Sequence, residues 1–164
     1  EKGISRKTSR WKKPAADTAP TESKAAGLYM IGTLAKYEAE KAGYIDALML
    51  DYRGYVAESS GANFFMVQDG VLKSPIPDCF LNGLTRQTVI QLAKDLKIPF
   101  EEIRIKPEDL EKAQEVFVTG TAAEITAVGK IDDQHFTVGP VTRKLRDAYE
   151  ALVRQQETRR AKAV

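Results

Sequence analysis

The chain has 164 residues, 43% of them hydrophobic and 29% charged, which is ordinary for a single globular domain. A net charge of +2 is too small to indicate a nucleic-acid or membrane-surface partner, and no apolar run approaches the roughly 20 residues of a membrane span. No signal peptide is expected, because no apolar segment follows the basic start. Cys79 is the only cysteine, which excludes an intramolecular disulfide and fits a reducing, cytoplasmic compartment.

Residues 1–20 have the composition of a basic, irregular segment. Six of the first 13 residues are basic, and two prolines within residues 14–20 resist regular structure. A nucleic-acid or targeting arm is one interpretation. An internal segment of a longer protein is the other, and it is favoured because charge runs are usually solvated faces. We therefore expect the folded domain to cover residues 21–157, followed by a polar tail at 158–164.

Helices and strands are mixed along the rest of the chain. Apolar residues at the helical period predict helices at Leu28–Ala42, Thr85–Leu96 and Gly139–Gln156, and Pro107 suits the start of a short helix to Ala113. Apolar and β-branched runs predict strands at Asp46–Asp51, Tyr55–Ala57, Asn63–Val67, Val71–Lys73, Phe100–Ile105, Glu115–Thr119, Ile125–Val128 and His135–Val138. Hairpin turns are expected at Asp69-Gly70 and Asp132-Asp133. The pattern predicts an α/β or α+β fold with a mixed sheet.

Two ionisable side chains are candidates for pyridoxal phosphate (PLP) chemistry. Lys24 lies among small residues, and a lysine that forms a Schiff base must be neutral to attack a carbonyl, so we expect it to be partly buried. Glu58 ends a strand, and a buried carboxylate on a pyridine nitrogen makes the ring a better electron sink. Taken singly, each is more simply a surface residue; the PLP interpretation depends on the pieces acting together.

Two turns could bind anions. Gly83-Leu84-Thr85 opens a helix, whose free N–H groups and dipole favour a phosphate. Gly120-Thr121-Ala122 follows a strand and offers consecutive amides and a hydroxyl. Ordinary turn chemistry is the alternative for both. His135, the only histidine, is expected at the surface, and no zinc site is predicted because no second histidine or cysteine accompanies it.

Four motifs, in this order and spacing, resemble the branched-chain amino-acid aminotransferases of the fold-type IV PLP family. They are Ser-Lys-Ala-Ala-Gly-Leu-Tyr at residues 23–29, Gly-Tyr-Val-Ala-Glu-Ser-Ser-Gly-Ala-Asn-Phe-Phe at 54–65, Leu-Asn-Gly-Leu-Thr-Arg at 81–86, and Val-Phe-Val-Thr-Gly-Thr-Ala-Ala-Glu-Ile-Thr at 116–126. The resemblance covers roughly residues 2–153. It implies the family's large domain, a mixed sheet or pseudo-barrel with flanking helices, and PLP as cofactor.

The resemblance also implies residue roles. Lys24 matches the lysine that forms the Schiff base and moves the substrate Cα proton, and Glu58 matches the acid on the pyridine nitrogen. Tyr29 matches the tyrosine near the cofactor's phenolic oxygen, and Leu81 a leucine that packs on the ring. The remaining matches are the phosphate contacts Leu84, Thr85 and Thr121, and the Thr121-Ala122 amides for the substrate carboxylate.

Transamination of leucine, isoleucine or valine with 2-oxoglutarate, in branched-chain amino-acid biosynthesis, is the activity that the resemblance implies, in a homodimer or larger homo-oligomer. A D-amino-acid aminotransferase or an aminodeoxychorismate lyase of the same fold is an alternative. A catalytically incomplete domain, acting as a structural fragment or binding module, is another. The family is about twice this length, and no arginine here matches the phosphate-binding arginine of its smaller N-terminal domain.

Overall fold

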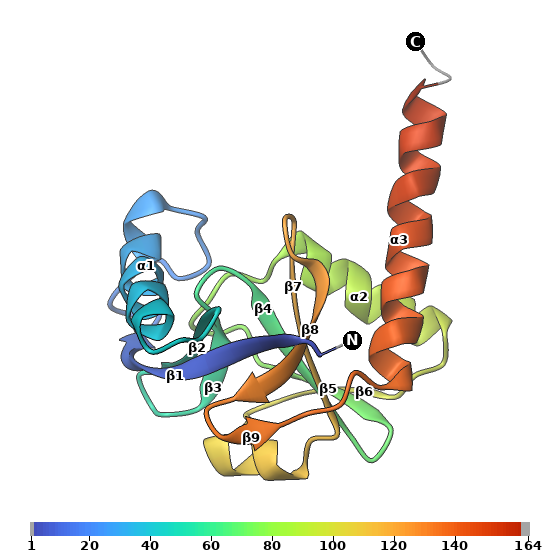
Figure 1. Ribbon diagram of the computed structural model, residues 1–164. Helices are drawn as coiled ribbons and strands as arrows, with labels where there is room; N and C mark the ends of the chain where they lie inside the picture. The colour runs from blue at the N-terminus through green and yellow to red at the C-terminus, as the bar shows by residue number, and fades with distance from the viewer. Residues whose placement is uncertain (1, 162–164) are drawn as a thin grey trace.

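A nine-stranded sheet forms the centre of the molecule in the computed structural model, which describes residues 2–161 and side chains as far as residue 155 (Figure 1). The strands are β1 (Ile4–Lys13), β2 (Asp46–Asp51), β3 (Val56–Ser59), β4 (Asn63–Gln68), β5 (Val71–Pro75), β6 (Phe100–Ile103), β7 (Glu115–Gly120), β8 (Glu124–Ile131) and β9 (Gln134–His135). The helices are α1 (Ala26–Lys41), α2 (Leu84–Asp95) and α3 (Pro140–Ala161), with a 3-10 helix, η1 (Pro107–Lys112).

The sheet closes on itself into a barrel-like ring. Its strand order is β3-β2-β1-β8-β7-β4-β5-β6, and β3 also pairs with β4. β1 runs parallel to both of its neighbours, whereas β4, β7 and β8 pair antiparallel. The pair that closes the ring is Glu58 opposite Asn63. The fold is therefore mixed α/β with a barrel-like sheet, which confirms the predicted class.

Side chains alternate between the inside and the outside of this ring. Phe64 of β4 and Val118 of β7 belong to the inner apolar cluster, whereas their neighbours Phe65 and Phe117 belong to the cluster that α2 and α3 cover. α1 lies against β1 and β2 (Figure 1), and its buried Ala35 and Ala39 pack on their outer face. Because both faces of β2, β4 and β7 are covered, the sequences of these three strands are nearly continuous apolar runs.

The N-terminal segment differs from the sequence prediction. Residues 4–13 are not irregular; they form β1, which lies between β2 and β8. Most of their basic side chains have acidic partners within the molecule: Arg6 with Asp46, Lys7 with Asp132, Arg10 with Glu38 and Lys13 with Glu58. Composition alone missed this strand because long cationic side chains can lie along neighbouring strands while their charged ends find partners. The folded unit therefore includes β1 and does not begin at residue 21.

Most other elements agree with the predictions to within a few residues. The short helix after Pro107 is a 3-10 helix, and β6 ends at Ile103 rather than Ile105. Of the strand expected at His135–Val138, only His135 pairs, within β9. The backbone of residues 158–161 continues α3, and the rest of the predicted polar tail lies outside the described residues.

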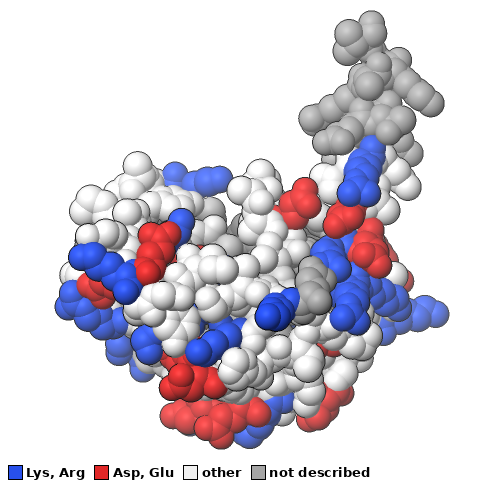
Figure 2. Space-filling view, viewed as in Figure 1, with Lys and Arg blue, Asp and Glu red and all other residues white. Residues whose placement is uncertain are grey.

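Charges of both signs are spread over the face shown in Figure 2. Acidic side chains gather at its lower edge, where η1 contributes Glu108 and Glu111, both exposed. Among the described residues, no helix has the length and apolar character needed to cross a membrane.

Candidate active site

A cavity of about 310 Å³ lies where the sheet closes, a volume at the lower end of the range for small-molecule sites. Its walls come from the end of β1, the connection into α1, β3, β4, the loop before α2, and the end of β7. The predicted residues that line it are Lys24, Tyr29, Glu58, Leu81, Leu84, Thr85 and Thr121. Ala122, the next residue in the turn after β7, is not among the lining residues. Segments far apart in sequence thus meet in one cavity.

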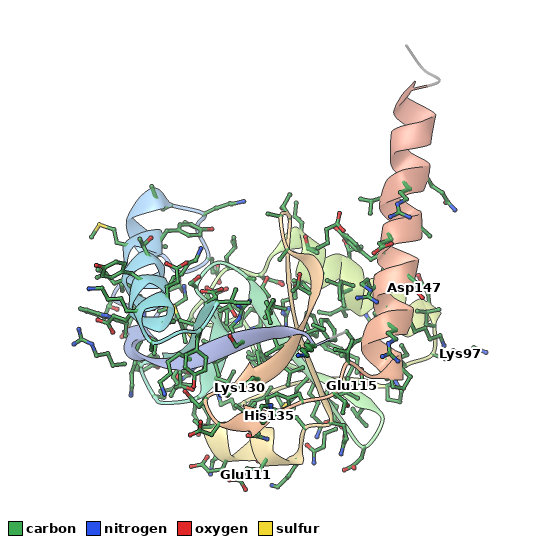
Figure 3. All side chains as sticks on the ribbon, in the orientation of Figure 1. Lys97, Glu111, Glu115, Lys130, His135 and Asp147 are labelled. Atoms are coloured by element: carbon green, nitrogen blue, oxygen red, sulfur yellow. The ribbon has the colours of Figure 1, made fainter. Side chains whose placement is uncertain are left out.

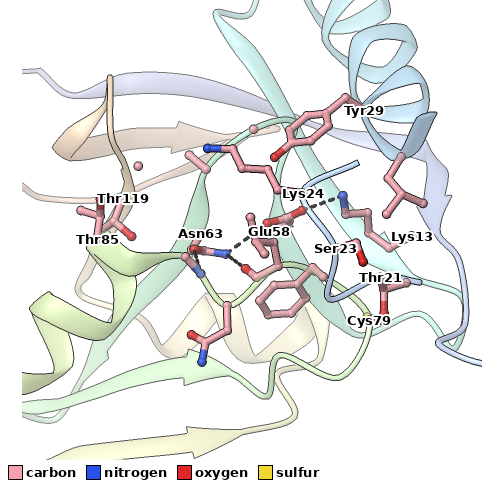
Figure 4. Close-up of a pocket in the computed structure, with 18 of the residues that line it drawn as sticks. Lys13, Thr21, Ser23, Lys24, Tyr29, Glu58, Asn63, Cys79, Thr85 and Thr119 are labelled. Carbon is pink, nitrogen blue, oxygen red and sulfur yellow. Dashed lines mark hydrogen bonds and ion pairs between the residues drawn. The ribbon is translucent and has the colours of Figure 1, made fainter. Parts of the chain in front are cut away.

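Glu58 is a buried carboxylate held from two sides (Figure 4). Lys13 Nζ lies 2.6 Å from Glu58 Oε1, and Asn63 Nδ2 donates a hydrogen bond to Glu58 Oε2 at 3.1 Å. Burial raises the pKa of Glu58 to about 6, with the Lys13 charge opposing that rise. Each carboxylate oxygen has a lone pair left, so Glu58 can accept one further donor from the cavity.

Asn63 links this carboxylate to the loop before α2. Its Nδ2 also donates to the Leu81 carbonyl at 2.9 Å, and its Oδ1 accepts from the Gly83 amide at 3.2 Å. Arg86, on the first turn of α2, is buried and anchors the same loop through the Asn82 side chain and the Pro75 carbonyl. The loop that carries Leu81 and the start of α2 is therefore fixed relative to Glu58.

The N-terminus of α2 is open toward the cavity. Gly83 is its N-cap, no side chain caps it, and no acidic residue lies in its first turn. The first amides of a helix lack intrahelical acceptors and carry the positive end of its dipole, so this end suits a phosphate. The buried Thr85 adds a hydroxyl there.

Two further threonines line the same cavity with no partner for their buried hydroxyls. They are Thr21 and Thr119, the only buried side-chain polar atoms without a hydrogen bond among the described residues. Thr119 lies beside Thr85, whereas Thr21 lies at the other end of the cavity, near Lys13 and Cys79 (Figure 4). A buried hydroxyl without a partner costs free energy, which a ligand that bonds to it recovers.

Lys24 differs from the sequence expectation because its side chain is exposed, not partly buried. It lies in the connection just before α1 and lines the cavity with Tyr29, which is 38% exposed. Leu84 and Thr121 are exposed as well, so the cavity has one open side. α1 lies close against the residue that follows β3: a Cβ added to Gly32 would overlap the Ser60 carbonyl oxygen.

An acidic cluster lies beside the cavity, whose lining includes its Cys79. One ligand atom each from Asp51, Asp78 and Cys79 lies within 4.8 Å of the others. Arg53 pairs with both carboxylates, at 2.6 and 2.8 Å. Burial raises the pKa of the Cys79 thiol to about 12, so it stays protonated and is a poor nucleophile. His135 is exposed on β9, away from α1 and α2 (Figure 3).

Lys13, Asn63 and Thr119 are site residues that the sequence interpretation did not single out. Lys13 was part of the basic run, and nothing local to it indicates that it faces Glu58. Asn63 lies within the Glu58–Phe65 motif, and its position opposite Glu58 is visible only once β3 and β4 pair. Thr119 lies two residues before Thr121. Because alternate side chains of a strand point to the same face, this spacing could have indicated that Thr119 faces the same cavity.

Known proteins are similar to this chain over most of its length. The family Amino-transferase class IV matches residues 2–131. A probable branched-chain-amino-acid aminotransferase of Rickettsia conorii is 43% identical over 163 residues, covering 94% of this chain and 55% of the relative. The branched-chain-amino-acid aminotransferase of Escherichia coli is 41% identical over 156 residues, covering 93% of this chain and 50% of the relative.

Solved structures share the fold as well. The branched-chain aminotransferase from Thermoproteus uzoniensis with norvaline is 41% identical with a TM-score of 0.89, covering 93% of this chain and 51% of that chain. An aminotransferase from Brucella abortus bound to PLP is 34% identical with a TM-score of 0.87, and the match covers 92% of this chain and 54% of that chain. The chain therefore belongs to the class IV aminotransferases. It spans about half the length of the curated relatives it matches.

Proposed function

We propose that this chain is the cofactor-binding part of a PLP-dependent branched-chain amino-acid aminotransferase, which transfers the amino group of leucine, isoleucine or valine to 2-oxoglutarate. The observation that carries the proposal is that Lys24, Glu58 and Thr85 line one cavity although more than 60 positions separate the first from the last. Their chemistry suits three different parts of PLP: its aldehyde, its ring nitrogen and its phosphate. The names of the similar proteins support the substrate class.

The residues present fit this cofactor. Glu58 is a buried acid with accepting capacity to spare, the N-terminus of α2 is uncapped, and Thr119 offers a hydroxyl without a partner. Two lysines and no arginine are among the described lining residues, so phosphate binding here depends on amides and hydroxyls. We expect affinity for the phosphate to be lower than in a site that also supplies an arginine.

Each of these residues has a task in the proposed reaction. PLP, when bound, supplies the electron sink that makes the substrate Cα–H acidic. Lys24 Nζ would accept the Cα proton as a general base and then, as a general acid, deliver a proton to the cofactor carbon rather than back to Cα. Glu58 would accept a hydrogen bond from the protonated ring nitrogen through its free lone pair, and the Tyr29 hydroxyl would serve the phenolic oxygen. Leu81 would pack on the ring, Leu84, Thr85 and Thr121 would hold the phosphate, and the Thr121-Ala122 amides would receive the substrate carboxylate.

PLP titration of the purified chain, followed by borohydride reduction and peptide mass mapping, tests the cofactor site. We expect one stable adduct, on Lys24, that is absent in Lys24→Ala and unchanged in Lys36→Ala, an exposed lysine on α1. Labelling of several lysines at similar yield would contradict the proposal for this chain. Transamination of L-leucine, compared with D-alanine and with aminodeoxychorismate as a lyase substrate, then separates the branched-chain assignment from its alternatives.

The open side of the cavity favours a second candidate, a domain that binds PLP without turning over substrate. Lys24, Leu84, Thr121 and Ala122 are all exposed. Water at these positions would compete with substrate and weaken the electrostatic interactions of the site. Bound PLP with no turnover of any of the three substrates would support this candidate.

We also infer that the chain forms a homo-oligomer. Apolar side chains on the outer face of α1, Met30, Leu34 and Tyr37, are exposed and would be covered by a second copy. A cytoplasmic location, which the single cysteine favours, stays a prediction.

A further inference from the structure

The Lys13 side chain pairs with the Glu58 carboxylate, on which the proposed chemistry depends. The two residues lie on strands that are not neighbours in the sheet. It is the last residue of β1, paired with Asp51 of β2, whereas Glu58 lies on β3, paired with Met49 of β2. The Lys13 side chain therefore crosses β2 to place Nζ 2.6 Å from Glu58 Oε1. The side chains of Lys13 and Glu58 are only 12% and 10% exposed, so water screens this pair little.

We propose that Lys13 is a positioning residue of the site: its ammonium keeps the Glu58 carboxylate charged and turned so that an oxygen stays available to a cationic ring nitrogen in the cavity. This inference rests on the proposed PLP function. Lys13 and Asn63 hold one carboxylate oxygen each, which fixes the plane of the group. A buried carboxylate without such a partner takes up a proton, and it would then offer no net negative charge to a pyridinium.

The other titratable groups near Glu58 do not replace Lys13. Lys24, in the connection before α1, and Tyr29, on α1, line the same cavity from its exposed side. Cys79, in the loop before α2, has a raised pKa and stays neutral, and Asn63 of β4 is uncharged. Among the described contacts, Lys13 is the cation that pairs directly with Glu58.

The test is a titration of the Glu58 side-chain carboxyl in the cofactor-free protein by ¹³C NMR, with the resonance assigned from Glu58→Gln. Wild type should titrate near pH 6. We expect Lys13→Met to raise that midpoint by at least one pH unit and Lys13→Arg to restore it. Lys12→Met is the matched control, because Lys12 is exposed one residue away on the same strand, and it should leave the midpoint unchanged.

A second measurement connects the pair to cofactor binding. Affinity for pyridoxamine 5'-phosphate, which cannot form a Schiff base with Lys24, should rise with pH above 6 more steeply in Lys13→Met than in wild type. The reason is that Glu58 must lose its proton to bind a pyridinium. A third measurement uses the wild-type protein alone and so does not depend on the folding of a variant. The chemical shift of the Lys13 ammonium should change with pH at the same midpoint as that of the Glu58 carboxyl.

The inference is overturned if Lys13→Met titrates like wild type, if Lys12→Met gives the same rise, or if the Lys13 ammonium does not sense Glu58. These outcomes come from the cofactor-free protein. They are therefore distinct from failure of the proposed function, which would appear as absent binding of PLP and pyridoxamine 5'-phosphate while the Glu58 titration and its dependence on Lys13 are intact.

Discussion

Glu58 is a residue whose role in the site opposes stability. Its pKa is about 6 in the folded protein against 4.5 ordinarily, because burial disfavours its charged form. Below pH 4.5 both states hold the proton, and between pH 4.5 and 6 the folded state holds more protons than the unfolded one. The free energy of unfolding therefore falls as pH rises through this window, by about 2 kcal/mol in total from this group, and the loss is complete above pH 6.

Urea unfolding of wild type and Glu58→Gln between about pH 4 and 7 isolates this contribution. Carboxylates with lowered pKa values, such as Asp78 and Asp132, make the free energy of unfolding increase with pH at lower pH. Their contributions are the same in both proteins and cancel in the difference. We expect the difference between the two proteins to shift by about 2 kcal/mol across the window, in the direction of lower wild-type stability at the higher pH. A flat difference would show that Glu58 titrates alike in both states.

Beside Thr85, Thr119 provides a test of the phosphate subsite. Thr119→Val keeps the side-chain shape and removes a hydroxyl that has no protein partner. We expect about a tenfold loss of PLP affinity, the worth of one hydrogen bond to a charged group, and little change for pyridoxal, which lacks the phosphate.

The matched control for this prediction is Thr21→Val, which removes the other buried hydroxyl without a partner. It lies away from Thr85 and should not distinguish PLP from pyridoxal (Figure 4). Equal losses for both ligands in Thr119→Val, measured by absorbance or fluorescence titration, would place the phosphate elsewhere.

Among the helices, α3 has its N-terminus stabilised by an acidic side chain from a strand. Glu115 of β7 is buried and accepts the Val141 amide at 3.2 Å, and the Thr142 amide and hydroxyl at 2.7 Å each. Glu115 thus caps the N-terminus of α3. Figure 3 shows its label near the start of this helix. The Gly139 backbone passes so close that a Cβ there would overlap the Glu115 carboxylate.

Glu115→Ala should lower the free energy of unfolding by about 2–3 kcal/mol, because it leaves buried donors at the helix start unpaired. Glu115→Gln, which keeps one acceptor oxygen, should lose less. Glu150→Ala is the control, since Glu150 pairs with Arg154 on the surface of α3 and such pairs are worth under about 1 kcal/mol. Chemical denaturation measures all three; similar values for Glu115→Ala and Glu150→Ala would contradict the capping role.

For the whole molecule, the exposed apolar face of α1 predicts self-association. Met30, Leu34 and Tyr37 are 67%, 43% and 55% exposed at helical spacing, while Ala35 and Ala39 on the opposite face are buried. We expect concentration-dependent association in sedimentation velocity, weakened in Leu34→Glu, which leaves the buried face intact. A monodisperse monomer at all concentrations would remove the support for a homo-oligomer.

Much of the fold was accessible from local pattern. The continuous run Asp46–Asp51 and the Asp69-Gly70 turn were predicted because burial on both faces and positive φ leave clear marks in sequence. β1 was not, because basic side chains dominate its composition and its pairing with β2 and β8 is parallel and distant in sequence. The position of β1 between β2 and β8 becomes visible only when the whole sheet is assembled.

The motifs that contain Lys24, Glu58 and the two glycine-containing turns indicate the family and the candidate chemistry through their order along the chain. The closed fold sets which side chains meet: Lys13 with Glu58 across β2, Asn63 with Glu58 at ring closure, and Thr119 beside Thr85. It also decided that Lys24 is exposed. The physical reason is that burial and pairing depend on the closed sheet and on segments tens of residues apart, whereas helical period, strand alternation and turn chemistry act over a few residues.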